Sequence, residues 1–494
     1  GKCTDGSCII APGGPPGCED GNPCTEDSCK PGGGCQSKNL SDVPCADGNA
    51  CTKDDHCNNG ICNGAPDPGC TSGNCPPGAY FEAWLGSDDK PDELVRAVPN
   101  GNGYLLFGSR SSAPASGEDG WIVQINNDGN IQGEAHFGTG GQERFTGALA
   151  GPDAWVAVGM TQSLSDVMPR GWFVSGVGLT KKVDVAYVPY GANGGKLLGI
   201  DMANGGGALA VGLASFTDAS PLQAWFLRVD ATGKILHDSI FGGPGHDLAY
   251  GVAPKFNGGG YAVVGRTKPA TGGTYQAFLT LLDGSGSPAG TELFGGGGND
   301  RFNAIMPSPQ GFLAAGTYDS QSDQSSQGWL VGMDQNGKQL WQQFFGGPAA
   351  EEFVAMVPIQ GGLGFALAGS AGDDAWVQRV DGSGNFFWQS MIPAPVSRTA
   401  LGIISLPGGG VLVLGKGVQK AGKESNGFIK RLDQWGHPDC KTAGICATKN
   451  LGACDDNNPC TIDTCEDGGC SAGKQAPDGS ACGPAKQCKS GQCI

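Results

Sequence analysis

Short apolar runs recur along the middle of the chain, separated by turns rich in Gly, Asn and Asp. One type of run is apolar and ends in Gly, and its copies are residues 104–108, 155–159, 208–212, 261–265, 312–316, 365–369 and 411–415. A second type opens with an aromatic residue and usually closes with Asp, and its copies are residues 121–126, 172–177, 225–230, 278–283, 329–334, 376–381 and 428–433. Runs of β-branched and aromatic residues between such turns predict β-strands.

These runs belong to a longer repeat. The segment Phe-Gly-Gly-Pro-Gly-His-Asp at 241–247 recurs as Phe-Gly-Gly-Gly-Gly-Asn-Asp at 294–300 and as Phe-Gly-Gly-Pro-Ala-Ala-Glu at 345–351. Looser copies begin at Phe137 and Tyr190, so the starts at 137, 190, 241, 294 and 345 lie 53, 51, 53 and 51 residues apart. A repeat of roughly 50 residues with four short strands has the size of one β-propeller blade.

The seven aromatic-led runs predict seven blades, which would close a ring and leave no long sheet edge exposed. The last repeat stops at Asp433 without its fourth strand. Residues 79–85 precede the first repeat and are similar to residues 340–345, which lie where a fourth strand is expected. We therefore expect residues 79–85 to close the ring by pairing with the last blade.

The cysteines are confined to the two ends of the chain. Of the 21 Cys, twelve lie within residues 3–75 and nine within residues 440–493, with none in between. Short segments that lack apolar residues need covalent cross-links. The sequence thus predicts an all-β fold, with a seven-bladed β-propeller at 79–439 and small disulfide-rich, loop-rich segments at 1–78 and 440–494.

Zinc is the competing explanation for so many cysteines. The chain has no C-x-x-C pair, and only His56 of the five His lies within a cysteine-rich segment. Zinc sites usually contain a closer pair of ligands. We therefore expect disulfides, which form outside the reducing cytosol and point to a secreted protein.

The cysteine-rich ends also repeat. Cys-Glu-Asp-Gly-Asn-Pro-Cys-Thr-Glu-Asp-Ser-Cys at 18–29 matches residues 45–57 and 454–465, and each copy is followed by a Gly-rich stretch and one more Cys. The connectivity of these repeats is open. The cysteines expected in disulfides are Cys18, Cys24, Cys29, Cys35, Cys45, Cys51, Cys57, Cys62, Cys454, Cys460, Cys465 and Cys470.

Both kinds of repeat resemble known extracellular families. The Phe-Gly-Gly starts and Trp-led strands of residues 79–433 resemble the β-propeller repeats of secreted bacterial surface proteins. The C-T-x-D-x-C core of the cysteine-rich ends resembles a repeat of slime-mould extracellular-matrix proteins, and similar arrays occur in secreted bacterial surface proteins. The resemblance implies work in the extracellular matrix or at the cell surface.

The Asp-Gly-Asn turns of the cysteine-rich repeats carry oxygen ligands of the kind that calcium prefers. The alternative is a turn in which Asp and Thr bond backbone amides, and this alternative is favoured. No other cofactor is expected. The candidate calcium ligands are Asp20, Asn22, Asp27, Asp47, Asn49, Asp54, Asp456, Asn457 and Asp463.

The net charge of −17 makes nucleic acid and anionic membranes poor partners. No apolar run approaches the ~18 residues that span a bilayer, so no membrane insertion is expected. Alignment of Trp388 with Trp341 adds a weaker repeat start at Ile392. The sixth residue after each repeat start is acidic at Glu143, Asp247, Asp300 and Glu351, whereas Lys196 and Arg398 break the series. These side chains would form either solvated turns, the favoured reading, or an acidic collar around the ring.

Three classes of function remain. The first is an extracellular structural or adhesive protein, with the propeller as a rigid body and the cysteine-rich ends as joints. The second is a module that binds a surface glycan or protein. The third is a propeller enzyme, a quinone-dependent oxidoreductase or a glycosidase, but near-identical repeats offer few non-equivalent residues, so no enzyme is expected. Only the irregular insertions at 109–119, 162–170 and 318–327 would make one face unequal.

Self-assembly is a further expectation. The number of cysteines is odd, and the last repeat, with Cys482, Cys488 and Cys493, is one Cys shorter than the repeat at 45–62. Residues 3–8, with Cys3 and Cys8, resemble the tail of a repeat. A head-to-tail contact through these five cysteines would build a fibre. A trimmed end or a free thiol are the alternatives.

We predict that mild reduction loosens residues 1–78 and 440–494 but leaves the β-sheet signal of the middle intact, because the middle contains no Cys. Circular dichroism with and without dithiothreitol, combined with limited proteolysis, measures this. Loss of all β structure on reduction would refute the proposed division of the chain.

Overall fold

The structure is a computed structural model, which describes residues 80–438 apart from 88, 112–116, 139, 152–153, 204–206, 218–219, 256–258, 270, 320–325, 348, 360–363, 408 and 435. Toward the two ends of the chain it describes residues 24, 40–45 and eleven short strands. The chain separates into two compact units, of which the larger comprises Glu82–Leu406 and Val411–Lys430. No helix among the described residues is long and apolar enough to cross a membrane.

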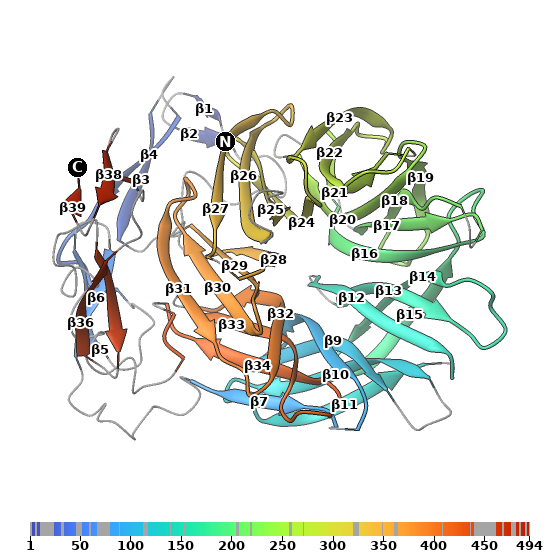
Figure 1. Ribbon diagram of the computed structural model, residues 1–494, viewed down its shortest axis with the longest axis horizontal. Coiled ribbons are helices and arrows are strands. Elements are labelled where there is room, and N and C mark those ends of the chain that lie inside the picture. The colour runs from blue at the N-terminus through green and yellow to red at the C-terminus, as the bar shows by residue number, and fades with distance from the viewer. Residues whose placement is uncertain are drawn as a thin grey trace. The chain divides into compact units, whose positions relative to one another are not determined.

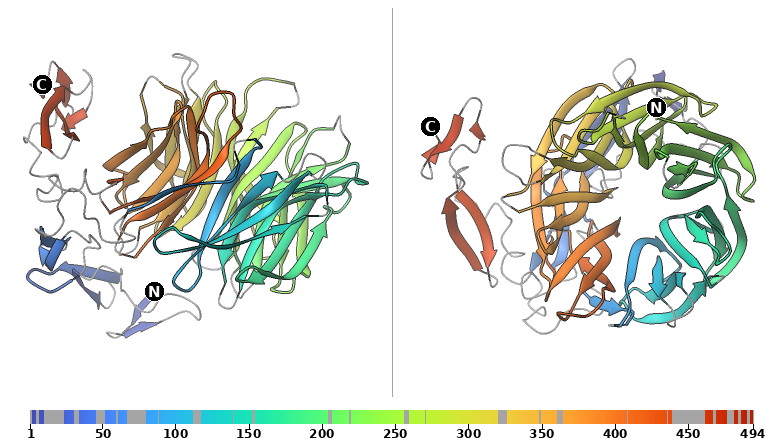
Figure 2. Two further views of the ribbon diagram at one scale, coloured as in Figure 1. Left: turned by 90° about the horizontal axis from the view of Figure 1, so that it is seen from below. Right: turned by 45° about the vertical axis from the view of Figure 1, so that its right-hand side comes forward.

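The larger unit is built from seven four-stranded antiparallel blades arranged in a ring (Figures 1 and 2). The first two blades join in one eight-stranded sheet through a single parallel bridge between Glu118 and Gln142. Blades 1 to 3 are β8 (Asp92–Pro99), β9 (Gly103–Ser111), β10 (Glu118–Asn126), β11 (Ile131–Phe137); β12 (Gln142–Ala150), β13 (Trp155–Gln162), β14 (Arg170–Val177), β15 (Thr180–Tyr187); β16 (Gly194–Met202), β17 (Ala208–Ser215), β18 (Gln223–Val229), β19 (Ile235–Phe241).

Blades 4 to 6 follow the same order, from the inner first strand to the outer fourth strand. They are β20 (His246–Pro254), β21 (Tyr261–Lys268), β22 (Gln276–Leu282), β23 (Pro288–Phe294); β24 (Arg301–Ser308), β25 (Gly311–Asp319), β26 (Ser326–Asp334), β27 (Gln339–Phe345); β28 (Glu351–Pro358), β29 (Phe365–Ala371), β30 (Asp374–Val380), β31 (Phe386–Ile392). The predicted all-β propeller is therefore confirmed.

The seventh blade combines the two ends of the propeller sequence. Its first three strands are β32 (Ser397–Ser405), β33 (Val411–Val418) and β34 (Asn426–Leu432), and its outer strand is β7 (Glu82–Leu85). Strand β7 pairs antiparallel with β34, with Leu85 opposite Gly427 and Glu82 opposite Lys430. The first strands of neighbouring blades pack against each other all the way round, including β32 against β8, so the ring is closed.

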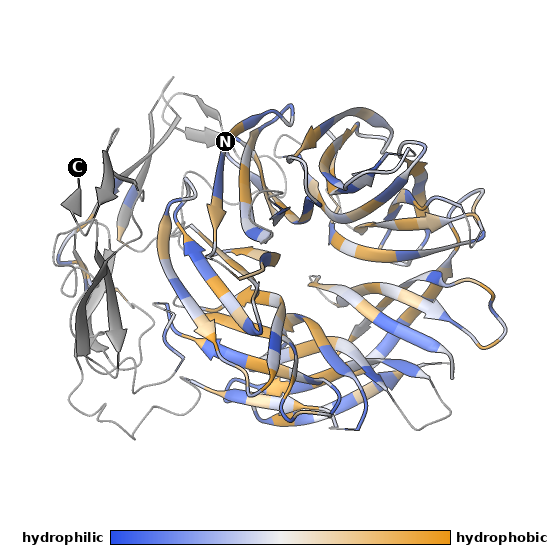
Figure 3. Ribbon diagram, viewed as in Figure 1, coloured by the Kyte–Doolittle hydropathy of each residue, from blue (hydrophilic) through white to orange (hydrophobic). Residues whose placement is uncertain are grey.

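Aromatic stacking fills the cores of blades 2, 5 and 6. A Phe of the first strand stacks on the Trp that opens the third strand, with ring centroids 4.7 Å apart for Phe302 and Trp329 and 4.6 Å apart for Phe353 and Trp376. These side chains are at most 2 % exposed. The Trp-led runs seen in the sequence are thus core positions, and apolar stretches lie along the strands of the ring (Figure 3). Each pair fixes the first strand against the third strand of its blade.

The described strands toward the chain ends form short antiparallel hairpins. They are β1 (Lys2–Thr4) with β2 (Ser7–Ile9), β3 (Thr25–Lys30) with β4 (Gly34–Asn39), β5 (Thr52–Asn58) with β6 (Ile61–Pro66), β35 (Thr461–Glu466) with β36 (Gly469–Gln475), and β37 (Ala481–Gly483), β38 (Lys486–Lys489) and β39 (Gln492–Cys493). In several hairpins the pair of residues one step before the turn-proximal pair consists of two cysteines opposite each other, as with Cys29 and Cys35.

Arg398 fastens the closing strand. Its guanidinium donates to Glu82 Oε1 at 2.7 Å and lies 4.5 Å above the ring of Trp84, and both partners belong to β7. Lys430 of β34 adds a second ion pair to Glu82 at 3.1 Å. Burial acts to raise the pKa of Glu82, but the charges of Arg398 and Lys430 outweigh it and hold that pKa below its ordinary value of 4.5.

We predict that Arg398→Met lowers the free energy of unfolding by about 2–4 kcal/mol, because it removes a buried ion pair and a cation–π contact together. The loss shrinks as the pH falls below about 4.5, since protonation of Glu82 removes the attraction in the wild type as well. Lys416→Met is the control, because Lys416 is paired with Glu93 at 3.1 Å but is 43 % exposed. Urea unfolding of the three proteins measures the difference, and equal losses would contradict the assigned role.

Candidate functional site

The acidic series predicted from the sequence is buried. Each first strand shifts register by one residue against the second strand, which gives a common reference point in all seven blades. At each shift one residue of the first strand has no partner in the second strand. Three positions before that residue, blades 1 to 7 have Asp92, Glu143, Gly195, Asp247, Asp300, Glu351 and Arg398. Apart from Gly195, each of these residues is at most 4 % exposed. The expectation of solvated turns is therefore wrong, and so is the alternative of an open acidic collar.

The buried carboxylates hold the linkers between blades. Four of the five accept a hydrogen bond from a backbone amide of the linker that precedes their strand, and the pairs are Ser87 with Asp92 (2.7 Å), Gly243 with Asp247 (2.8 Å), Gly296 with Asp300 (2.7 Å) and Gly347 with Glu351 (2.9 Å). The first Gly of the Phe-Gly-Gly turn packs against this carboxylate. Gly295 has φ 115°, and a Cβ there would lie 2.0 Å from Asp300 Oδ2. Burial raises the pKa of these carboxyls, although the amides act in the opposite direction.

The third blade departs from this rule. By strand register Tyr187, and not Tyr190, corresponds to Phe241. The prediction that Lys196 is equivalent to the acidic residues of the other repeats is therefore wrong. The linker before β16 is two residues longer than the linker before β20, and Gly195 takes the position of the carboxylate. The amide of Gly195 donates to Pro169 O at 2.8 Å, as the amide of Asp247 donates to Leu222 O in the next blade.

Steric crowding explains the glycine. A Cβ on Gly195 would lie 2.8 Å from Pro189 Cγ, and a Cβ on Gly194 would lie 2.6 Å from Met168 Cβ. Pro189 belongs to the longer linker, and Met168 belongs to the connection between β13 and β14. Two irregular segments, 162–170 and 188–193, thus meet over a pair of glycines.

A cleft of about 360 Å³ opens at this place, on the face that carries the blade linkers and the connections between second and third strands. We call it the blade 2/3 cleft. It is lined by Asp166, Val167, Met168, Arg170, Val188, Asn193 and Thr217.

The polar side of the cleft is rigid. Asp166 accepts the amide of Ser163 at 3.1 Å and the guanidinium of Arg170 at 2.7 Å. Hydrogen bonds from Ser163, aided by the charge of Arg170, hold the pKa of Asp166 below its ordinary value. Asn193 donates its backbone amide to Ser215 O at 2.9 Å, so the long linker is fixed to blade 3.

Two apolar lining residues of the cleft, Val167 and Val188, and their neighbours in the chain are exposed, and we call them its rim. Leu164 and Val167 of the 162–170 connection are both 86 % exposed, and Val188 of the linker is 40 % exposed. Tyr190, in the same linker, is 86 % exposed. Clustered exposed apolar side chains mark a surface for association. The sequence indicated the insertion at 162–170. It did not indicate the longer linker at 188–193, because Tyr190 was assigned as a repeat start.

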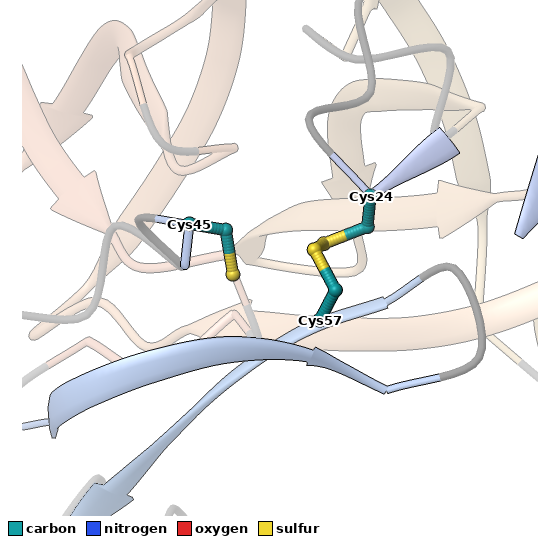
Figure 4. A group of neighbouring side chains, drawn as sticks. All are labelled: Cys24, Cys45 and Cys57. Atoms are coloured by element: carbon teal, nitrogen blue, oxygen red, sulfur yellow. A yellow bond between two sulfur atoms is a disulfide. The ribbon is translucent and has the colours of Figure 1, made fainter. Parts of the chain in front are cut away.

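The cysteine-rich repeats are described only in part. A disulfide joins Cys24 to Cys57, which come from two successive repeats, and Cys45 is also disulfide-bonded (Figure 4). These three are the one group among the described residues with metal-ligand spacing. Because their sulfurs are oxidised, they offer no thiolates to zinc.

The remaining predicted residues of the chain ends have side chains outside the described residues. These are Cys3, Cys8, Cys18, Cys29, Cys35, Cys51, Cys62, Cys454, Cys460, Cys465, Cys470, Cys482, Cys488 and Cys493, and the calcium candidates Asp20, Asn22, Asp27, Asp47, Asn49, Asp54, Asp456, Asn457 and Asp463.

The cysteine-rich ends are similar to a known repeat. Residues 17–40 and 453–472 match the model of the Dictyostelium (slime mold) repeat. No curated protein sequence matches the chain significantly.

Solved structures that resemble the chain include the Dos1 propeller, with 11 % identity, 71 % of this chain and 94 % of that chain covered, and a TM-score of 0.43. The Cps50 (Swd1) propeller domain of Myceliophteria thermophila has 10 % identity, 71 % and 99 % coverage and a TM-score of 0.44. An α-L-arabinanase of Penicillium chrysogenum complexed with arabinobiose has 11 % identity, 72 % and 98 % coverage and a TM-score of 0.43.

We predict that Gly194→Ala destabilises the propeller by about 1–3 kcal/mol and displaces the 162–170 connection, because the new methyl group overlaps Met168. Gly243→Ala is the matched control, since a Cβ at this linker glycine meets nothing within 4 Å. Thermal melts and proteolysis at the 162–170 connection report the two effects. Equal melting temperatures for the two variants would show that close packing at Gly194 and Gly195 does not hold the 162–170 connection in place.

Proposed function

We propose that the chain is an extracellular structural and adhesive protein, in which the propeller is a rigid body and the cysteine-rich ends are joints. The observation that carries the proposal is the exposed apolar rim of the blade 2/3 cleft, which lies where the repeat is least regular. Six of the seven blades keep a charged side chain at the position that Gly195 takes in blade 3, so blade 3 is the blade in which this position has no charge.

The disulfide between Cys24 and Cys57 supports the second half of the proposal. It joins cysteines that are 33 residues apart in the chain and belong to two successive repeats, so these repeats are covalently cross-linked. Such bonds persist in an oxidising, extracellular environment. The match to the Dictyostelium (slime mold) repeat is consistent with a role in a matrix or at a cell surface.

The partner that we propose is a second copy of this chain. Two copies with a net charge of −17 each repel one another, so they associate through a neutral apolar surface and not through charge pairs. The rim of the blade 2/3 cleft is such a surface. Salt screens the repulsion, so self-association should strengthen as the ionic strength rises.

We predict that sedimentation velocity detects self-association that is stronger at about 0.5 M than at about 0.05 M sodium chloride. The double variant Leu164→Ser, Val167→Ser should stay monomeric at both, because it removes the exposed apolar rim. Ile131→Ser is the control, because Ile131 is 57 % exposed but opens the outer strand β11 at the hairpin with β10.

A wild-type protein that remains monomeric at every concentration and salt level would refute self-association through the cleft. Loss of association in Ile131→Ser to the same extent as in the double variant would show that general surface hydrophobicity is responsible. Reduction of the disulfides should not abolish the contact, because Leu164 and Val167 lie in the cysteine-free propeller.

A further inference from the structure

A second cavity of about 360 Å³ lies between blades 5 and 6 on the same face of the ring. Its wall includes Arg301 of β24, Thr317 and Asp319 of β25, and Glu351 and Glu352 of β28, together with Asn299 of the preceding linker. We call it the blade 5/6 cavity. Its polar lining contrasts with the apolar rim of the blade 2/3 cleft.

Two of the side chains that line the blade 5/6 cavity are deeply buried and carry a polar atom without a hydrogen-bond partner. Glu351 is 4 % exposed, and its Oε2 is unpaired, although its Oε1 accepts the amide of Gly347. Thr317 is 7 % exposed, and its hydroxyl is unpaired. Arg301 Nε is a third such atom. Buried polar atoms nearly always find a partner, so three at one cavity call for an explanation.

Comparison between blades explains the unpaired carboxylate oxygen. In blade 2 the equivalent carboxylate, Glu143, faces Thr161 across the first two strands and accepts its hydroxyl at 2.9 Å. In blade 4, Asp247 faces Thr267 and accepts its hydroxyl in the same way. In blade 6 the residue opposite Glu351 is Ala371, which has no hydroxyl. Glu351 thus accepts the linker amide with one oxygen, as three of the other four carboxylates do, and its other oxygen is free for a ligand.

The charges of the cavity restrict what can bind. Arg301 is paired with Glu352, which leaves Asp319 and Glu351 as uncompensated acids in the wall. An anionic ligand is therefore repelled. A bare cation would satisfy Glu351 but would leave Arg301 Nε without an acceptor. A hydroxyl group both donates and accepts hydrogen bonds, so neighbouring hydroxyls meet all three needs.

We propose that the blade 5/6 cavity binds a neutral polyhydroxylated ligand, a sugar residue of a glycan. One hydroxyl donates to Glu351 Oε2, a second accepts from Arg301 Nε, and the Thr317 hydroxyl completes the contact. The size of the cavity lies within the range of small-ligand sites. This inference stands apart from the proposed self-association, because the two surfaces share no residue.

Saturation-transfer NMR and isothermal titration of the full chain test the proposal, with neutral methyl glycosides of hexoses and pentoses as probes and methyl glucuronide as the anionic comparison. We expect at least one neutral glycoside to bind and the glucuronide to bind more weakly. Glu351→Gln should weaken binding by about tenfold or more, because an amide nitrogen replaces the acceptor oxygen.

Thr317→Val is the second variant. Its hydroxyl has no partner in the protein, so an apolar group of the same shape should keep the fold stable while binding of the glycoside weakens. This variant decides the question if Glu351→Gln does not fold. Asp247→Asn is the control, because it alters the equivalent carboxylate of blade 4 and should leave glycoside binding unchanged.

Three results would overturn the proposal: no neutral glycoside binds at millimolar concentration, the glucuronide binds as tightly as the neutral glycosides, or both cavity variants bind like the wild type. Calcium or an alkylammonium salt that binds the full chain while Glu351→Gln abolishes this binding and no neutral glycoside competes with it would assign the cavity to a cation and would also overturn the proposal. The Leu164→Ser, Val167→Ser variant should bind the glycoside normally, which separates this outcome from that of the proposed function.

Discussion

The ring depends on the pairing of four residues at the start of the propeller with its last complete strand. Strand β7 (Glu82–Leu85) is separated from β34 by more than three hundred residues, so its pairing closes a very long loop and receives no help from a tight turn. Four backbone pairs alone would be a weak closure. Arg398 compensates, because it joins the ion pair with Glu82 to stacking on Trp84 and Phe428 in one buried side chain.

One position in the repeat serves three purposes. As Asp or Glu it ties the linker to the blade through a backbone amide, and this fixes the angle between neighbours in blades such as the fourth and fifth. In blade 7 the position is Arg398, which fastens the closing strand. In blade 3 it is Gly195, whose missing side chain leaves room for a longer linker. A closed ring tolerates such exceptions, because the remaining blades hold the first strands in place.

The sequence predicted the propeller because its signals are local and repeated seven times: apolar runs, Trp-led strands and Gly turns. It also indicated the closing strand through the similarity of residues 79–85 to residues 340–345. The carboxylates were misjudged because exposure at a turn cannot be read from residue type. An acidic side chain followed by a strand reads as solvated, yet Asp300 is fully buried and bonded to the amides of Gly296 and Asp319.

The two candidate binding places were only partly visible in the sequence. The insertion at 162–170 stood out, but the cleft also needs the longer linker at 188–193, whose aromatic Tyr190 was mistaken for the repeat start. The blade 5/6 cavity depends on the absence of a hydroxyl at Ala371, opposite Glu351. That absence becomes informative only when strand register shows which residue faces the carboxylate.

The geometry of the last blade sets how the propeller would respond to mechanical tension. Because β7 and β34 run antiparallel, the chain enters at Glu82 and leaves after Lys430 from the same end of the pair. A force that pulls on both flanks therefore peels the two strands apart one rung at a time, and does not shear all of their hydrogen bonds together. The Phe81–Arg431 backbone bond and the contact of Tyr80 with Asp433 stand at the first rungs. Under tension the ring would open at this blade well before its other six blades yield.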